Sequence, residues 1–281
     1  MGIIRNRRVF GRTLGSTLAC AVSVGLLALW ETGRGTVLSA GAAQSAPEFG
    51  YSGDNGPGFW GETPGWDACT GTARTQRQSP IDIGHVVFDR HLEPLQLQLH
   101  ETPLALTNNG HTIEEEYEPG SSLTVNGVVY GLSQFHFHTL SEHTVAGRHA
   151  AMELHAVFAD PASDNKAVVG QLFVIGKADR FVAEVLRHGL PAKSGDEVNV
   201  PSQMINVAGA LTNTSRYYTY PGSLTTPPCT ETVTWFVLHE FAQMSSEQFD
   251  AFRHILGENF RPLQKPDGRT ILSSVGQDDA R

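Results

Sequence analysis

The chain has 281 residues and a net charge of −9, with 40% hydrophobic and 17% charged side chains. This length and composition are typical of a globular protein with a sizeable core. Nucleic acid is excluded as a natural partner, because phosphate binding requires clustered cations and this chain is acidic.

The N-terminus predicts export. Arginines precede an apolar stretch, Leu14–Trp30, which small residues around Ala40–Ala42 follow, and this order is typical of a signal peptide. Ser, Thr and Gly interrupt the stretch, so we expect no stable membrane anchor. The pair Arg7-Arg8 also fits a twin-arginine signal, which leaves the export route open. We predict a signal peptide over residues 1–42, one folded domain over 43–281, and a periplasmic or secreted location.

Two of the three cysteines, Cys69 and Cys229, lie in the predicted mature domain. Exported proteins occupy an oxidising compartment, so an even count favours a disulfide. Closing so long a loop typically adds about 2–4 kcal/mol to the free energy of unfolding. The alternative is a pair of unconnected buried thiols.

Short apolar runs separated by Gly, Pro and Asn predict strands and turns. Asn126-Gly127 between Leu123–Val125 and Val128–Tyr130 predicts a β-hairpin, because both turn residues tolerate positive φ. The run Val168–Ile175 is apolar on both faces, which predicts a central strand covered on both sides. Further strands are expected at Leu132–His138, Ala151–Ala159, Ala167–Ile175 and Glu231–His239.

Two helices are also expected. Ala178–His188 has one apolar side and stops at Gly189. Ser245 and Gln248 have the spacing of a capping box, and an apolar stripe follows them up to Gly257. The elements together predict a mainly β, sheet-dominated single domain with few helices.

The segment Gln134–His138 reads Gln-Phe-His-Phe-His. Successive side chains of a strand point to opposite faces, so the glutamine, His136 and His138 share one face. His155 is the best third candidate, because it also lies on a predicted strand. Three imidazoles with a water in the fourth position form a catalytic zinc site. The glutamine and Glu153 are suited to accept the second ring N–H of such ligands.

A His-x-His pair alone is more often structural than metal-binding, so the surrounding sequence carries the weight of this prediction. Eight other histidines have no comparable arrangement and are interpreted as surface or core residues: His85, His91, His100, His143, His149, His188, His239 and His254.

Short motifs extend over almost the whole predicted domain: Gln78–Ile83, Asn108–His111, Gln134–His138, Ser141–His143, Glu153–His155, Tyr220–Pro228 and Asn259–Pro262. Together they resemble the α-class carbonic anhydrases, of the bacterial exported type. The resemblance implies an α+β fold built on a large central mixed, mostly antiparallel twisted β-sheet with a few short peripheral helices. It also implies reversible hydration of CO2 to bicarbonate and a proton by attack of zinc-bound hydroxide.

The resemblance assigns a role to each matching residue. It implies that His136, His138 and His155 bind Zn2+. Thr225 is expected to accept a hydrogen bond from the zinc hydroxide and to donate one to Glu142, which orients the nucleophile. The backbone N–H of Thr225 is expected to contact substrate, with Thr226 nearby.

The implied substrate is a small molecule, CO2 or bicarbonate. Four residues match the apolar wall where CO2 docks: Val157, Val168, Leu224 and Trp235. The chain is expected to work as a monomer or homodimer, and Cys69 and Cys229 match the disulfide of bacterial relatives.

Two alternatives to this function are a zinc esterase of small acyl substrates and a non-catalytic carbonic anhydrase-like binding module. No acyl pocket is visible, however, and all three zinc histidines are present.

His111 matches the proton shuttle of the family, with Tyr51, Asn108 and Asn109 expected to organise water beside it. Histidine suits this task because its ordinary pKa, about 6.5, lies near neutrality. Glu114 follows the shuttle where many relatives have a neutral residue. We hypothesise that its charge raises the pKa of His111 or repels anionic inhibitors.

Overall fold

The computed structural model describes residues 48–71 and 77–276. These residues belong to one compact unit, Ala46–Arg281. The predicted signal peptide, residues 1–42, lies outside the described residues and stays a prediction. Within the described ranges, no helix has the length and apolar character needed to cross a bilayer.

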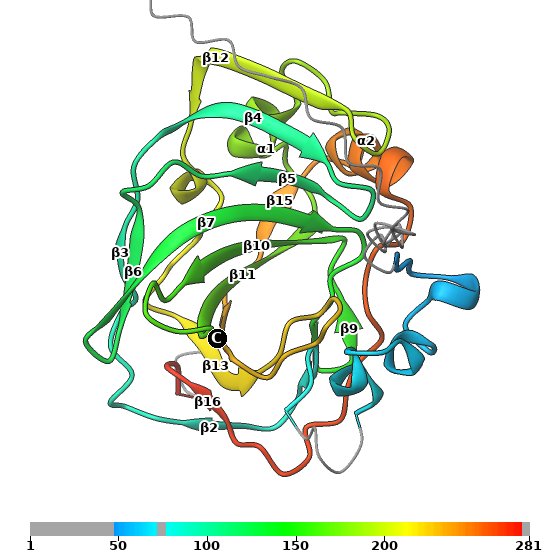
Figure 1. Cartoon of the computed structure of the whole chain (residues 1–281). Coiled ribbons are helices and arrows are strands. Elements are labelled where there is room, and N and C mark those ends of the chain that lie inside the picture. Colours follow the sequence, from blue (N-terminus) through cyan, green and yellow to red (C-terminus); the bar gives the residue numbers. More distant parts are fainter. Residues whose placement is uncertain (1–47, 72–76, 277–281) are drawn as a thin grey trace, which may run out of the picture. The chain divides into compact units, whose positions relative to one another are not determined.

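The fold is dominated by β-strands (Figure 1). In the described residues these are β1 (Asp82–Ile83), β2 (Val86–Phe88), β3 (Gln96–Gln98), β4 (Thr102–Asn108), β5 (Ile113–Glu116), β6 (Ser122–Val125), β7 (Val128–His138), β8 (Thr144–Val145), β9 (Arg148–His149), β10 (Met152–Ala159), β11 (Lys166–Ile175), β12 (Glu197–Ile205), β13 (Tyr217–Gly222), β14 (Val233–Leu238), β15 (Ala242–Met244) and β16 (Ile271–Ser273).

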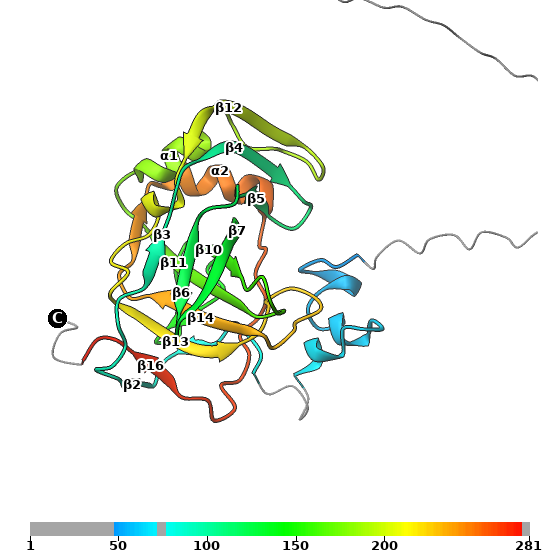
Figure 2. The ribbon, with the colours of Figure 1, turned by 60° about the vertical axis from the view of Figure 1, so that its left-hand side comes forward.

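One 13-stranded sheet runs in the order β12-β4-β5-β7-β10-β11-β14-β13-β16-β2, with β15 paired to β11 and β6 paired to β7 and β3. Its pairs are antiparallel except β11 with β14, β11 with β15, and β16 with β2. In Figure 2, β13 runs across the direction of β7, which shows the strong twist of the sheet. A smaller sheet has the order β1-β8-β9. The prediction of a large mixed, mostly antiparallel sheet is therefore confirmed.

The predicted hairpin is confirmed in detail. Asn126 and Gly127 have φ of 50° and 81°, and the residues flanking them pair as Val125 with Val128. The strand after the turn continues without a break to His138. The two strands predicted on either side of Gly131 are therefore one long strand, which carries the histidine pair.

The described helices are few and short: α1 (Arg180–Leu186), α2 (Ser246–Leu256), and 3-10 helices at Gly53–Asn55, Trp60–Glu62, Asp67–Thr70 and Val207–Gly209. At α2 the predicted capping box is present, since the side chain of each partner, Ser245 and Gln248, accepts from the backbone N–H of the other. α1 is shorter than predicted, because the Asp179 side chain caps it by accepting from the backbone N–H of Val182.

Side-chain alternation gives the large sheet two different faces. Phe135 and Phe137 of β7 contact Phe181 of α1 and Phe252 of α2, with ring centroids 5.6 Å and 4.6 Å apart respectively. Both helices therefore cover this face, which holds the larger core. The other face carries a smaller core that includes Trp235 and, on the neighbouring strands, the histidines of the candidate site. As predicted, β11 is central and buried on both faces.

Strand β5 buries a carboxylate on the helix-covered face. Glu115 is 0% exposed and alternates along the strand with Glu114 and Glu116. Its two oxygens lie 2.8 Å and 3.0 Å from the backbone nitrogen of Ala105. Burial raises the pKa of Glu115 to about 7, although the hydrogen bond from Ala105 acts in the opposite direction. A charged Glu115 therefore opposes folding at alkaline pH.

Glu115→Gln is expected to stabilise the protein at high pH. The pKa of this carboxyl group is higher in the folded chain than in the unfolded chain, so stability falls as pH rises from about 4.5 through about 7. We expect the variant to raise the free energy of urea unfolding by about 1–3 kcal/mol near pH 8.5, and the gain to shrink towards pH 5. Glu118→Gln, an exposed control just beyond β5, should change little at either pH. An equal gain at both pH values would contradict the buried-charge explanation.

Candidate metal centre

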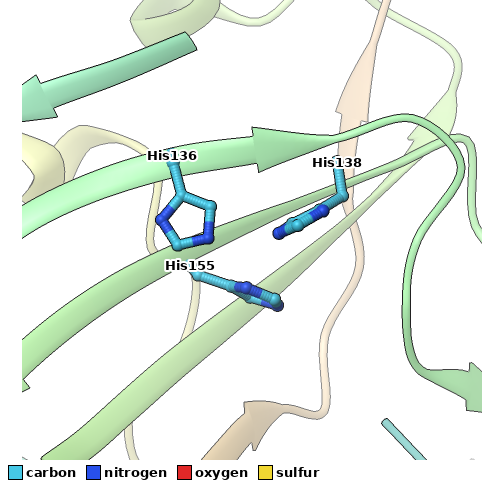
Figure 3. Close-up of side chains that lie close together, drawn as sticks. All are labelled: His136, His138 and His155. Carbon is cyan, nitrogen blue, oxygen red and sulfur yellow. The ribbon is translucent and has the colours of Figure 1, made fainter. Parts of the chain in front are cut away.

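Three imidazoles converge beside the large sheet (Figure 3). His136 and His138 come from β7, and His155 comes from β10, where it pairs directly with His136. One ring nitrogen of each lies within 4.8 Å of the others. The ring centroids are 4.7–5.1 Å apart, and His138 and His155 are each 1% exposed. The structure thus brings together the three ligands predicted from sequence.

The outward ring nitrogen of each histidine meets an oxygen acceptor. Such an acceptor places the ring proton on the outward nitrogen and leaves the inward lone pair free for a metal. The inward atoms are Nε2 of His136, Nε2 of His138 and Nδ1 of His155, and Nε2 of His138 is buried without a hydrogen-bond partner. The acceptors are Oε1 of Gln134 at 2.8 Å from His136, the backbone oxygen of Asn259 at 2.6 Å from His138, and Oε1 of Glu153 at 2.9 Å from His155.

The surroundings favour the neutral form of the two histidines on β7. Burial is the main cause that lowers the pKa of His136 well below its ordinary value, and repulsion from His138 and His155 lowers it further. Burial also lowers the pKa of His138, against the charge of Glu142. Neutral imidazole nitrogens in a set of three are the donors that catalytic Zn2+ sites use. The residues present therefore fit that ion.

Glu153 is shared between His155 and a fourth histidine. The carboxylate is 0% exposed, and Oε1 also lies 2.8 Å from Nδ1 of His143, while Oε2 accepts from the backbone N–H of that residue. Nε2 of His143 lies 2.7 Å from the hydroxyl of Tyr220, which donates to Ser79. His143 is a core residue, one of the two environments expected, but sequence reasoning missed its support of Glu153. The Ser141–His143 motif was the available signal.

The charge of Glu153 is stabilised locally. Burial, the largest influence, raises the pKa of this carboxyl group, but His143 and His155 together lower it well below its usual range. The strand opposite also leaves space, because Gly170 pairs with His155 and a Cβ there would lie 2.9 Å from Oε1 of Glu153. A larger residue at Gly170 would therefore displace the carboxylate.

Glu142 lies against the inward nitrogens. Its Oε2 is 3.6 Å from Nε2 of His138 and 4.0 Å from Nδ1 of His155, and its Oε1 accepts from the backbone N–H of Arg261. Because Oε2 is turned towards the imidazoles, it has no hydrogen-bond partner, and the expected bond from Thr225 is not formed. Thr225 is buried in the loop between β13 and β14, where the carbonyl of the next residue, Thr226, accepts from Cys229.

An apolar wall lies beside the ligands, on the same face of the sheet. Val157 follows His155 by two residues on β10, pairs with Val168 on β11, and Val168 in turn pairs with Trp235 on β14. Leu224 packs against the same cluster, and the Trp235 ring lies 4.8 Å from that of His155. The four residues predicted for the apolar wall therefore pack together beside the candidate metal centre.

His111 is stacked on an aromatic ring that sequence reasoning did not single out. Its centroid is 3.7 Å from that of Phe49, with the planes 11° apart. Tyr51 meets Phe49 edge-on, and its buried hydroxyl has no hydrogen-bond partner. Burial lowers the pKa of His111, while the charge of Glu48 acts to raise it. The carboxylate that raises this pKa is thus Glu48, and the hypothesis that it is Glu114 was wrong.

Asn108 and Asn109 hold the loop that carries His111. Asn108, 6% exposed, donates from Nδ2 to the carbonyl of Pro191 and accepts at Oδ1 from the N–H of Gly110. Oδ1 of Asn109 accepts from the next two backbone N–H groups. Both polar groups of Asn108 bind the backbone, and its expected role in organising water stays a prediction.

The predicted disulfide joins Cys69 to Cys229. It connects the 3-10 helix Asp67–Thr70 to the loop that carries Thr225, and it packs with Trp60 and Phe49 in a small separate core. It thereby ties the segment that contacts His111 to the loop beside the metal centre. A structural disulfide is typical of proteins in oxidising compartments.

Three histidines with free inward nitrogens, beside an apolar wall on a twisted mixed sheet, are typical of the metal centre of a metalloenzyme. The sequence matches the eukaryotic-type carbonic anhydrase family over residues 55–275. The chain belongs to this family, and within it to the α class of carbonic anhydrase enzymes.

Individual relatives agree. Alpha carbonic anhydrase 7 of Arabidopsis thaliana is 33% identical over 270 residues, covering 91% of this chain and 96% of the relative. Carbonic anhydrase of Neisseria gonorrhoeae is 34% identical, covering 84% and 92%. The solved structure of Thermovibrio ammonificans α-carbonic anhydrase, in complex with the inhibitor sulfanilamide, superposes with a TM-score of 0.76 at 36% identity, covering 81% and 100%.

Glu153→Gln is expected to weaken zinc binding. Both rings use Oε1 of Glu153, while Oε2 accepts from the backbone N–H of His143. An amide keeps only one acceptor oxygen, so its NH2 group must face either that N–H or the two rings, and the anchor of His155 is weakened in both orientations. Changes to such outer partners typically reduce metal affinity about 10- to 100-fold. The zinc dissociation constant, measured by competition with a chromophoric chelator, should rise by that factor. Glu115→Gln, a buried acid on the opposite face, is the matched control, and equal affinity in all three proteins would refute the anchoring role.

Proposed function

We propose that this protein is a zinc-dependent carbonic anhydrase that reversibly hydrates CO2 to bicarbonate and a proton. The observation that carries the proposal is the convergence of three inward ring nitrogens whose outward nitrogens all have acceptors. Family membership supports the same reaction.

His136, His138 and His155 hold the metal in this proposal. Zn2+ bound there supplies Lewis acidity that makes a nucleophile available from water near neutral pH, an effect for which carbonic anhydrase is itself the standard example. Uncharged ligands suit this task, because they leave the positive charge of the ion less compensated than carboxylate ligands would. Gln134 and Glu153 keep the rings in the required orientation.

The apolar wall receives CO2. Val157, Val168 and Trp235 are 8%, 3% and 2% exposed, so the uncharged substrate replaces little water when it docks beside them. Leu224 completes this wall. Thr225 and Thr226 follow Leu224 in the loop between β13 and β14, and in this proposal the backbone N–H of Thr225 binds an oxygen of substrate or product. Glu142, buried against the ligands, would orient the attacking group by accepting a hydrogen bond from Thr225 once the metal is bound.

His111 carries the released proton to solvent. It is only partly buried, so it can exchange protons with buffer. Its lowered pKa leaves it in the neutral, proton-accepting form around neutral pH. Stacking on Phe49 holds the ring, and the hydrogen bonds to Asn109 hold its loop.

The protein acts outside the cytoplasm in this proposal. The basic, then apolar, then small-residue order of residues 1–42 supports removal of a signal peptide, with residues 43–281 forming the mature enzyme. The disulfide supports a periplasmic or secreted location.

Removal of the metal is expected to abolish activity. Purified protein should contain about one zinc per chain, and CO2 hydration followed by stopped flow should disappear on chelation and return with Zn2+. His155→Ala should lose bound zinc and activity together, because only two of the three imidazole ligands remain. Zinc-free wild-type protein without activity would instead indicate a binding module. A zinc enzyme that cleaves small esters much faster than it hydrates CO2 would indicate an esterase.

His111→Ala is expected to slow proton release and leave CO2 attack intact. In weak buffer kcat should fall at least about tenfold while kcat/KM stays unchanged, because only kcat includes the regeneration step. Added imidazole buffer should restore kcat by replacing the missing base. His188→Ala, an exposed histidine after α1, is the control and should change neither constant. A parallel fall of kcat and kcat/KM without rescue would refute the shuttle role.

A further inference from the structure

Two carboxylates of β5 share the face that carries the metal centre. Glu114 pairs directly with His136, and Glu116 pairs directly with Gln134, on the neighbouring strand β7. Directly paired side chains of antiparallel strands project from the same face, with Cβ atoms about 5 Å apart. Figure 1 shows β5 immediately beside β7. The strand thus places two acids next to a predicted ligand and next to that ligand's hydrogen-bond partner.

The charge of this pair is not neutralised locally. Among the described residues, no recorded hydrogen bond or ion pair joins the side chain of Glu114 or Glu116 to another group. Glu116 is exposed and Glu114 is partly buried, whereas the acid between them, Glu115, points into the opposite core. Their negative field therefore acts on whatever occupies the metal centre.

A second observation marks where a ligand belongs. Nε2 of His138 and Oε2 of Glu142 are buried, lack hydrogen-bond partners and lie 3.6 Å apart beside His136. These unpartnered atoms face the centre from one side, and Glu114 flanks it from β5. A group bound at the centre therefore lies near the unpaired carboxylate of Glu114.

We propose that Glu114, reinforced by Glu116, is a specificity determinant that disfavours anionic ligands at the metal centre and leaves uncharged ligands unaffected. This inference rests on the proposed zinc enzyme. Coulomb repulsion between like charges at such separations remains appreciable near a protein surface and weakens with added salt. CO2 carries no charge and enters freely, while bicarbonate and inhibitory anions are bound less tightly.

Ligand binding to the cobalt(II)-substituted enzyme tests this directly, with visible absorption as the readout and no dependence on turnover. Thiocyanate is the anionic probe, and imidazole, at a pH where it is uncharged, is the neutral probe. We expect Glu114→Gln to tighten thiocyanate binding about three- to tenfold, and Glu114→Gln with Glu116→Gln to tighten it further. The effect should shrink as sodium sulfate is added, and imidazole affinity should not change.

Glu118→Gln removes one negative charge just beyond the paired part of β5 and is the matched control. It should leave both dissociation constants unchanged. The inference is overturned if thiocyanate affinity is the same in wild type and the double variant, or if imidazole affinity rises in parallel. Wild-type protein that binds neither zinc nor cobalt would overturn the proposed function as well. Wild type that binds metal and hydrates CO2 without the charge effect would overturn this inference alone.

Discussion

The candidate site depends on one shared, buried carboxylate. Glu153 carries its charge in a sheet interior, where an unpaired ion would cost several kcal/mol. Two imidazoles and one backbone N–H compensate it, and Gly170 provides the space that it occupies. Because Glu153 cannot shift without losing these bonds, His155 has one ring orientation. The ligand geometry is therefore set by the protein, which is the preorganisation that a catalytic metal site requires.

The strand pleat extends this constraint to the rest of the site. On β7 each ligand alternates with a phenylalanine, and Phe135 and Phe137 are fixed against the two helices. The core face thereby holds the backbone that positions His136 and His138. The strand pairing continues from Val157 on β10 to Val168 on β11 and Trp235 on β14. The ligands and the apolar wall therefore lie next to each other on one face of the sheet. Function and packing share these strands on opposite faces.

Sequence predicted those parts of the fold whose signals are local. The hairpin at Asn126-Gly127, the capping box at Ser245 and the shared face of His136 and His138 each depend on residues close together in the chain. The strand β13 was missed, because Tyr220-Pro221-Gly222 has the composition of a turn, yet it pairs with β14. Partners such as Asn259, 121 residues from His138, depend on tertiary contacts that no local pattern encodes.

Three consecutive glutamates on β5 lie in different environments, because the pleat of the strand turns successive side chains to opposite faces. Glu115 enters the core, where burial raises its pKa to about 7, whereas Glu114 and Glu116 face the metal centre. A negative field at that centre has two linked effects, since it stabilises a bound cation and disfavours an anion on the same cation. Removing the charge should therefore weaken metal retention slightly while it strengthens anion binding. The opposite signs distinguish a field effect from a general loosening of the site, which would weaken both.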